Sequence, residues 1–445
     1  MKRLLSILAI VCLLCTALGG AFAADGSPSA EPLRVFAIGP HSPEEFAALH
    51  PDLPVTLIHV TYDSQGLSNK DELLLAGDWD VATVDVGSRW ANAVTLQQLY
   101  DRGLALDLRG DPVLAAKAEA LFPAIRQAIT VNGMPVALPF RIYRSVMQMQ
   151  IATWPEEAQS TFARLGFTQA DVPHTFRDLA DLAEAYMALP VETRRSTVFS
   201  VSYLDGASSS AYPYYLYYLI ALYTAEFCDV NGAVDYDTPA FRAALDDLKR
   251  LAGALAQDPK VRYTGDGSLT GLLSDASQMF SGSCADRQNL NLYIQNSEAI
   301  PAKLRVLVIN PNTTQPEQAL RYVSIMAEEA SARFYPLLYA NANPSALAKR
   351  AYEAQLAELQ GDSGNVEPAY VENFIKTYAN DPGAFFARNY FSPEQLADYR
   401  QNIAPRLTFP PIPLVSTGTA AETYLRNNEL DVEGLIRHLN DEAAR

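Results

Sequence analysis

Short apolar runs alternate with predicted helices in the first ninety residues. The apolar runs Leu33–Ile38, Val55–Val60 and Val81–Val86 are typical of buried strands. Helical spacing is predicted at Lys70–Ala76, and a further helix is expected to start near Ser42. An order of strand, helix, strand, helix, strand predicts a parallel α/β unit.

The helix start near residue 42 has the features of an N-terminal cap. Ser42 is placed to cap, Pro43 takes the first helical position, and Glu45 stands where a capping box closes. The spacing that follows predicts that Phe46 and Leu49 face the core.

A hairpin is predicted around Asn132-Gly133, a dipeptide that tolerates the positive φ angles of a tight turn. The flanking strands are expected at Ala128–Val131 and Pro135–Leu138. A second apolar run follows at Ser145–Ile151.

Capped helices dominate the pattern further on. Thr175 with Asp178 forms a capping box, and Thr238-Pro239 opens a helix that Gly253 is expected to end. The remaining predictions are a strand at Leu304–Ile309, a helix at Pro316–Glu328, a capped start at Ser392-Pro393 and a mostly helical last hundred residues.

The first 23 residues have the pattern of a secretory signal peptide. Basic Lys2 and Arg3 precede the apolar run Leu4–Leu18, and Ala21-Phe22-Ala23 supplies a cleavage site. The apolar run is shorter than the roughly 20 residues that a membrane-spanning helix needs. A flexible tether is expected at 24–32, and the protein is expected in the periplasm or the extracellular cell envelope. Lipid anchoring is not supported, because no small residue directly precedes Cys12 or Cys15.

Composition narrows the class of protein. The chain has 445 residues and a formal net charge of −17, from 34 Lys and Arg against 51 Asp and Glu. Its length predicts two or three domains at about 100 to 200 residues each. So acidic a surface repels phosphate backbones, which excludes nucleic acid as a partner and disfavours anionic membrane surfaces.

Motifs of catalysis and metal binding are absent from the sequence. It contains no HExxH, GxSxG, CxxC or Gly-rich phosphate loop, and its five histidines are scattered. Carboxylates are abundant, but abundance without spacing does not indicate glycosidase chemistry. We therefore expect no enzyme activity, no cofactor and no metal site.

Two cysteines, Cys228 and Cys284, remain after the signal peptide. In an oxidising compartment they are candidates for a disulfide. The alternative is two buried thiols that act as small hydrophobic groups.

Several segments occur in a fixed order: Phe46–Val60, Leu75–Val81, Gly103–Leu108, Asn132–Pro139, Val172–Leu179, Ala233–Phe241 and Tyr424–Leu430. Together they resemble the extracellular solute-binding proteins of ABC importers, in particular the large sugar-binding class, family 1, and the resemblance covers most of the chain. One departure is Ser281-Gly282-Ser283-Cys284, where many members have a Gly-x-Trp that contacts the ligand.

The resemblance implies a periplasmic-binding-protein-like α/β fold. Two α/β lobes are joined by a multi-strand hinge, and the ligand lies in the cleft between them. From the order of the elements, lobe 1 is expected at 33–140 plus 302–335 and lobe 2 at 141–301 plus 336–445. The loops at the carboxyl ends of parallel strands then meet at the cleft.

The candidate ligand-binding residues follow from that geometry. Aromatic faces suit the apolar face of a sugar, while Asp and Arg bind its hydroxyls. In the first lobe and its hinge the candidates are Tyr62, Asp63, Asp85, Trp90, Tyr143, Arg144 and Trp154. In the second lobe they are Tyr203, Asp205, Tyr212 and Tyr214, whereas the tyrosines further on, to Tyr223, are expected in the core.

We therefore expect a monomeric solute-binding component that carries a carbohydrate, or a similar small polar solute, to ABC transporter permease subunits. Lobe closure on the ligand would be the signal to the permease. The alternatives are a secreted hydrolase acting on carbohydrate and a two-lobed ligand sensor. A ferric-ion site is weaker still, because the set of metal ligands is incomplete.

Overall fold

The computed structural model describes residues 31–36, 43–61, 69–87, 94–144, 147–150, 175–193, 201–202, 212–228, 233–256, 263–264, 273–275, 289–291, 294–295, 299–329, 334–361, 366–410 and 432–444.

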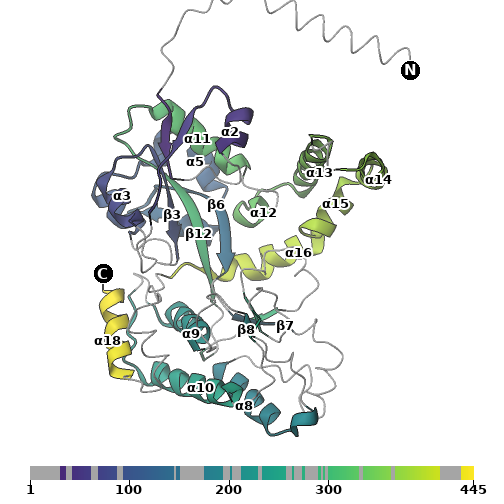
Figure 1. Ribbon diagram of the computed structural model, residues 1–445. Helices are drawn as coiled ribbons and strands as arrows, with labels where there is room; N and C mark the ends of the chain where they lie inside the picture. The colour runs from purple at the N-terminus through teal and green to yellow at the C-terminus, as the bar shows by residue number, and fades with distance from the viewer. Residues whose placement is uncertain are drawn as a thin grey trace, which may run out of the picture.

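A six-stranded mixed sheet forms the centre of the upper part of the molecule in Figure 1. The parallel strands β1, β2 and β3 confirm the predicted α/β unit, and β12 joins this unit antiparallel to β3 and β6. The strands are β1 (Leu33–Val35), β2 (Val55–Leu57), β3 (Val81–Val86), β6 (Leu138–Arg144), β12 (Ile300–Ile309) and β13 (Leu407–Thr408).

Helices α2 (Pro43–Leu49) and α3 (Lys70–Ala76) connect the parallel strands. Phe46 is fully buried as predicted, but the prediction for Leu49 is wrong, since 57% of it is exposed. The ring of His50 takes the place beside Phe46, with 4.8 Å between the ring centroids. The short helix therefore turns His50 toward the core side and Leu49 toward solvent.

The predicted hairpin is confirmed. Strands β4 (Thr130–Val131) and β5 (Met134–Pro135) pair antiparallel, and both turn residues between them have positive φ, 51° at Asn132 and 79° at Gly133. Further helices beside the sheet are α4 (Leu96–Asp101), α5 (Pro112–Glu119), α6 (Pro123–Ala128), α11 (Pro316–Glu329) and α12 (Tyr335–Leu338).

A chain of four helices extends to one side of the sheet (Figure 1): α13 (Pro344–Gly361), α14 (Pro368–Tyr378), α15 (Pro382–Asn389) and α16 (Pro393–Asp398). Ser392 makes the predicted capping box at α16. Stacked and edge-on rings of Tyr352, Phe374 and Phe385 hold α13, α14 and α15 together. We call these helices the helical arm.

The core of the sheet continues into the helical arm. One buried hydrophobic cluster contains Leu33 of β1, Leu337 of α12, Tyr352 of α13 and Leu407 of β13. The predicted lobe boundaries stay a prediction, but this cluster favours assigning 336–410 to the first lobe. We call the described parts of 31–144 and 299–410 the sheet lobe.

The described parts of 147–295 and 432–444 form what we call the helical lobe, the lower part of Figure 1. Its helices are α8 (Phe176–Met187), α9 (Tyr212–Phe227), α10 (Pro239–Ala256) and α18 (Val432–Ala443). The Thr175–Asp178 capping box begins α8 as predicted. Gly253 was expected to end α10 but lies inside it, because no adjacent residue forces the chain out of the helix before Ala256.

Short strands complete the helical lobe. They are β7 (Met147–Gln150), which pairs antiparallel with β10 (Leu273–Asp275) and β11 (Asn289–Asn291), and the parallel pair β8 (Val201–Ser202) and β9 (Tyr263–Thr264). Helix α18 docks on this lobe through Asn440, whose side-chain oxygen accepts a 2.9 Å hydrogen bond from the Tyr236 amide.

The chain passes between the lobes at three places: from β6 to β7, from β11 to β12, and from β13 to α18. Gly87, directly after β3, lies at these crossings with a φ of 85°. A Cβ there would lie 2.4 Å from the carbonyl oxygen of Ala302 in β12. Only glycine fits this conformation and this close approach of two backbones.

Candidate functional site

A charged face lies on the sheet where the chain crosses between the lobes. Arg305 of β12 stands opposite Asp85 of β3 and Arg141 of β6, and Lys303 stands opposite Tyr143. Since side chains alternate between the two faces of a strand, these five side chains share one face. The burial pattern agrees, because Lys303 and Arg305 are half-buried while Leu304 and Val306 are buried.

Asp85 and Arg305 form the buried ion pair of this face. Arg305 Nε donates to Asp85 Oδ1 over 3.0 Å, and the Asp85 side chain is fully buried while 33% of the Arg305 side chain is exposed. A carboxylate removed from water needs such a partner. The pair therefore anchors one end of the guanidinium and leaves part of it accessible.

Tyr143 contacts three cations, two at its ring and one at its hydroxyl. Lys303 Nζ lies 5.2 Å and Arg305 Cζ lies 6.0 Å from the ring centroid, and Arg141 Nη1 donates to the hydroxyl over 3.3 Å. Phe334 supports the ring at 5.9 Å between centroids. Contacts of cations with an aromatic face are attractive and hold flexible side chains in place.

Lys70, at the start of α3, belongs to the same group of charges. Burial is the largest cause that lowers the pKa of its ammonium; the charges of Arg305 and Lys303 lower it further, while those of Asp85 and Asp71 raise it. We call Lys70, Arg141, Lys303 and Arg305, with Asp85 and Tyr143, the cationic face.

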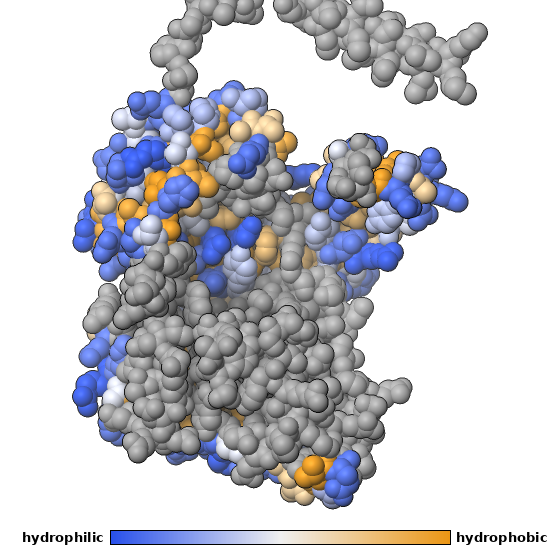
Figure 2. Space-filling view, viewed as in Figure 1, coloured by the Kyte–Doolittle hydropathy of each residue, from blue (hydrophilic) through white to orange (hydrophobic). Residues whose placement is uncertain are grey.

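The cationic face lies beside the helical lobe. Arg144 ends β6 and Met147 begins β7 of the helical lobe, while α9 of that lobe contacts β12. The surface over the ends of β6 and β12 is hydrophilic in the space-filling view (Figure 2). Ligands of α/β proteins bind outside the carboxyl ends of parallel strands, and β3 ends here.

Two predicted residues, Asp85 and Tyr143, come together on the cationic face through Arg305. Arg144 is the last residue of β6, and Tyr212 and Tyr214 lie in the first turn of α9. The prediction that the later tyrosines are in the core is confirmed for Tyr223, which is fully buried. The remaining candidates, Tyr62, Asp63, Trp90, Trp154, Tyr203 and Asp205, lie outside the described residues, and their roles stay predictions.

Sequence reasoning missed Lys70, Arg141, Lys303 and Arg305. The available signal was charge at every second strand position, as in Arg141-Ile142-Tyr143 and Lys303-Leu304-Arg305. Such a pattern in a buried strand marks one polar face. Nothing in the sequence alone pairs β6 with β12, which lie far apart along the chain.

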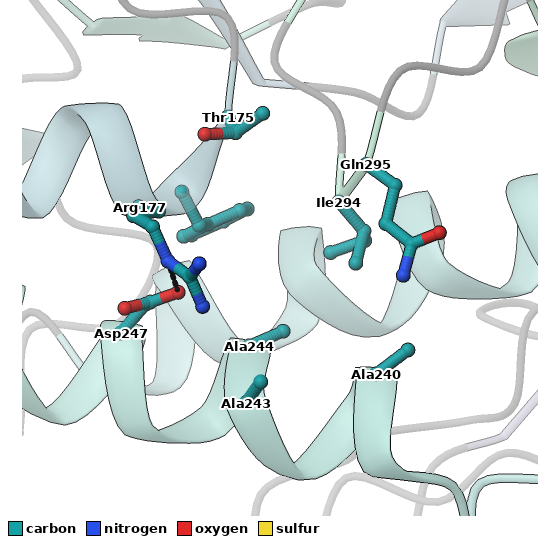
Figure 3. Close-up of a pocket in the computed structure, with 9 residues that line it drawn as sticks. Thr175, Arg177, Ala240, Ala243, Ala244, Asp247, Ile294 and Gln295 are labelled. Atoms are coloured by element: carbon teal, nitrogen blue, oxygen red, sulfur yellow. Dashed lines mark hydrogen bonds and ion pairs between the residues drawn. The ribbon is translucent and has the colours of Figure 1, made fainter.

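A second candidate is a cavity of 290 Å³ in the helical lobe (Figure 3). Residues at the start of α8 line one side, alanines of α10 form another, and Ile294 and Gln295 close the third. Arg177 Nε binds Asp247 Oδ2 over 3.3 Å, and Asp247 Oδ1 also accepts from Arg250 over 3.2 Å. The charges around this cavity already satisfy one another, so the cationic face is the stronger site.

Neither a metal-ligand cluster nor a candidate membrane helix occurs among the described residues. Among the described residues, no three His, Cys, Asp or Glu side chains gather as a metal site would require. None of the described helices has the length and apolar character to cross a bilayer. Cys228 is half-buried after α9, and Cys284 lies outside the described residues, so their disulfide stays a prediction.

Comparisons with known proteins place the fold. No family model matches the chain, and no curated protein matches it. A structure from work on xylan utilization by Caldanaerobius polysaccharolyticus is 13% identical, with a TM-score of 0.54 over 92% of this chain and 99% of that chain. A putative oligosaccharide periplasmic-binding protein from Synechococcus sp. MITs9220 is 14% identical, with a TM-score of 0.51 over 93% and 99%.

An ABC transporter solute-binding protein from Agrobacterium vitis S4, solved with bound D-mannitol, is 13% identical, with a TM-score of 0.50 over 94% of this chain and 98% of that chain. At these identities the likeness concerns the fold. It confirms the predicted architecture along almost the whole chain. The protein has the α/β periplasmic-binding-protein fold of ABC transporter solute-binding proteins.

Proposed function

We propose that the protein is the extracytoplasmic solute-binding component of an ABC transporter and carries a carbohydrate or polyol to the permease subunits. The observation that supports this most is a polar, aromatic-containing face placed where three chain segments join the two lobes. A ligand that touches both lobes there would stabilise the closed arrangement by its differential affinity for it. The neighbours with the same fold are solute-binding proteins, one of them solved with D-mannitol.

The candidate ligand contacts are those predicted from the sequence together with the cationic face. Asp85 and Tyr143 are positioned by the sheet, and Trp90, Asp63 and Tyr203 are proposed to complete the site from the loops. We further propose export by residues 1–23, a monomeric state and no catalytic activity.

A thermal-shift screen of the protein without its first 23 residues tests the proposal. The panel contains monosaccharides, oligosaccharides, polyols, polyamines, peptides and iron chelates. A ligand present at 100 times its Kd stabilises by about 2.7 kcal/mol. We expect a sugar or polyol to give such a shift.

Three outcomes would contradict the proposal. A shift with a polyamine or metal chelate and with no sugar or polyol would remove the carbohydrate assignment. Turnover of a glycoside, lost when one carboxylate is replaced, would establish the hydrolase instead. If a ligand binds but no permease accepts the loaded protein in reconstituted vesicles, the sensor alternative takes its place.

A further inference from the structure

We propose that the cationic face binds an anionic group, a carboxylate or a phosphate, carried by a solute of carbohydrate or polyol size. The inference rests on the proposed function and narrows it, because it assigns the ligand to sugar acids and sugar phosphates rather than neutral sugars.

The first argument is the local balance of charge. The chain as a whole carries 51 acidic against 34 basic residues, yet the cationic face groups four basic side chains around Asp85, with Asp71 as a further carboxylate near Lys70. The positive charges of Arg305 and Lys303 lie close enough to Lys70 to lower its pKa. Grouping like charges is electrostatically unfavourable. An anion bound here relieves that repulsion.

The second argument is the partners of Arg141 and Lys303. Within the described part of the chain, neither side chain forms an ion pair; both are held by the Tyr143 side chain, through its hydroxyl and its ring face respectively. By contrast, Arg242 and Arg250 of the helical lobe each contact at least two carboxylates. Aromatic contacts orient Arg141 and Lys303 without neutralising them, so their charge remains for a ligand.

The third argument is chemical fit. A guanidinium binds a carboxylate or phosphate through two parallel hydrogen bonds, and a lysine ammonium adds a point charge. Asp85 accepts from the Nε of Arg305, and 33% of the Arg305 side chain is exposed. Tyr143, half-buried between the cations, offers an apolar ring edge to the carbon skeleton of the same ligand.

Titration calorimetry with matched pairs of probes tests the inference. The pairs are glucuronate with glucose, galacturonate with galactose, and mannitol 1-phosphate with mannitol; inorganic phosphate is measured alone. We expect the anionic member of at least one pair to bind ten or more times more tightly than its neutral partner. The sugar acids and the phosphate ester distinguish a carboxylate from a phosphate ligand.

Substitutions on the cationic face test whether the anionic probe binds there. Lys303→Gln and Arg141→Gln are each expected to weaken the anionic probe about tenfold, and sodium chloride should weaken it in the wild type more than in either variant. Lys249→Gln, in α10 of the helical lobe and away from both candidate sites, is the matched control and should leave affinity unchanged. Two variants on different strands keep the test valid if one of them fails to fold.

The outcomes separate this inference from the proposed function. If a neutral sugar or polyol binds at least as tightly as its anionic partner and both variants bind it normally, the anionic assignment is wrong while the solute-binding function stands. If no probe of either kind binds, and inorganic phosphate alone does, both are wrong.

Discussion

Arginine has different surroundings in helix α10 and on the cationic face. In the helical lobe, Arg250 of α10 contacts Asp181 and Glu184 of α8 over 2.6 and 2.7 Å and Asp247 over 3.2 Å. In the sheet lobe, Asp85 faces several cations at once, and Tyr143 supplies the other contacts. The carboxylates of the helical lobe join two helices by neutralising a cation. The cationic face of the sheet lobe instead gathers positive charge beside the crossings.

The largest expected loss of stability comes from Gly87, at the crossings between the lobes. Gly87→Ala places a methyl group against the Ala302 carbonyl oxygen at a φ of 85°. Backbone strain and overlap together should lower the free energy of unfolding by about 4 kcal/mol. Urea denaturation followed by circular dichroism measures the change.

The matched control is the glycine inside α10. A Cβ on Gly253 meets no atom within 4 Å, and alanine is the better helix former, so Gly253→Ala should raise the free energy of unfolding by up to about 1 kcal/mol. Equal effects of the two substitutions would show that the close approach at Gly87 does not constrain the crossing.

Removal of the single carboxylate of the cationic face is expected to rank next. Asp85→Asn keeps the volume but leaves Arg305 without its charged partner among the other cations. Loss of about 3 kcal/mol is expected, since one member of a buried pair is removed. The same denaturation experiment tests it. A loss below about 1 kcal/mol would mean that Asp85 does not hold this face together.

The fold was largely predictable because local signals and tertiary structure agree. Lys70–Ala76 ends at Gly77, whose φ of 72° favours glycine, and the predicted bounds of that helix match the structure. The hairpin at Asn132-Gly133 is equally local. The prediction for Leu49 failed because α2 has only seven residues and the ring of His50, directly after it, packs beside Phe46 instead.

The site was less predictable, because it depends on strand pairing across a long sequence separation. Asp85 was predicted from the end of a strand and Tyr143 from its place near the first hinge crossing, but Lys303 and Arg305 join them only because β12 pairs with both β3 and β6. No local rule specifies that register. The same limit applies to the lobe boundary, which stays a prediction: Leu337, Tyr352 and Leu407 lie in the core of the sheet lobe, although the order of the elements assigns them to lobe 2.

A smaller effect tests how the segment directly after α16 is joined to α12. Tyr399 donates to the Leu337 carbonyl oxygen over 2.7 Å, so Tyr399→Phe should lower the free energy of unfolding by about 1.5 kcal/mol. The Tyr339 hydroxyl is buried with no hydrogen-bond partner in the described part of the chain. Tyr339→Phe should therefore leave stability at neutral pH unchanged or slightly higher.

The pH dependence separates these two tyrosines further. Burial raises the pKa of the Tyr339 phenol above its usual value. Stability linked to it is fully present below about pH 10, the pKa of an unfolded tyrosine, and falls as the pH rises beyond that. Tyr339→Phe should flatten this alkaline fall in a series of denaturation curves from pH 9 to 11. An unchanged slope would mean that this phenol does not contribute to it.

The smallest expected loss of stability comes from Glu184 of α8, one of the carboxylates beside Arg250. Glu184→Gln removes one of the carboxylates around Arg250, but Asp181 and Asp247 remain within 3.2 Å. The Glu184 side chain is 46% exposed, so the free energy of unfolding should fall by less than about 0.5 kcal/mol, and by less still at high salt. Denaturation at two salt concentrations measures this beside Asp85→Asn. Losses of equal size would mean that Asp85 and Glu184 have the same role, and the contrast between the cationic face and the neutralised arginine of α10 would fail.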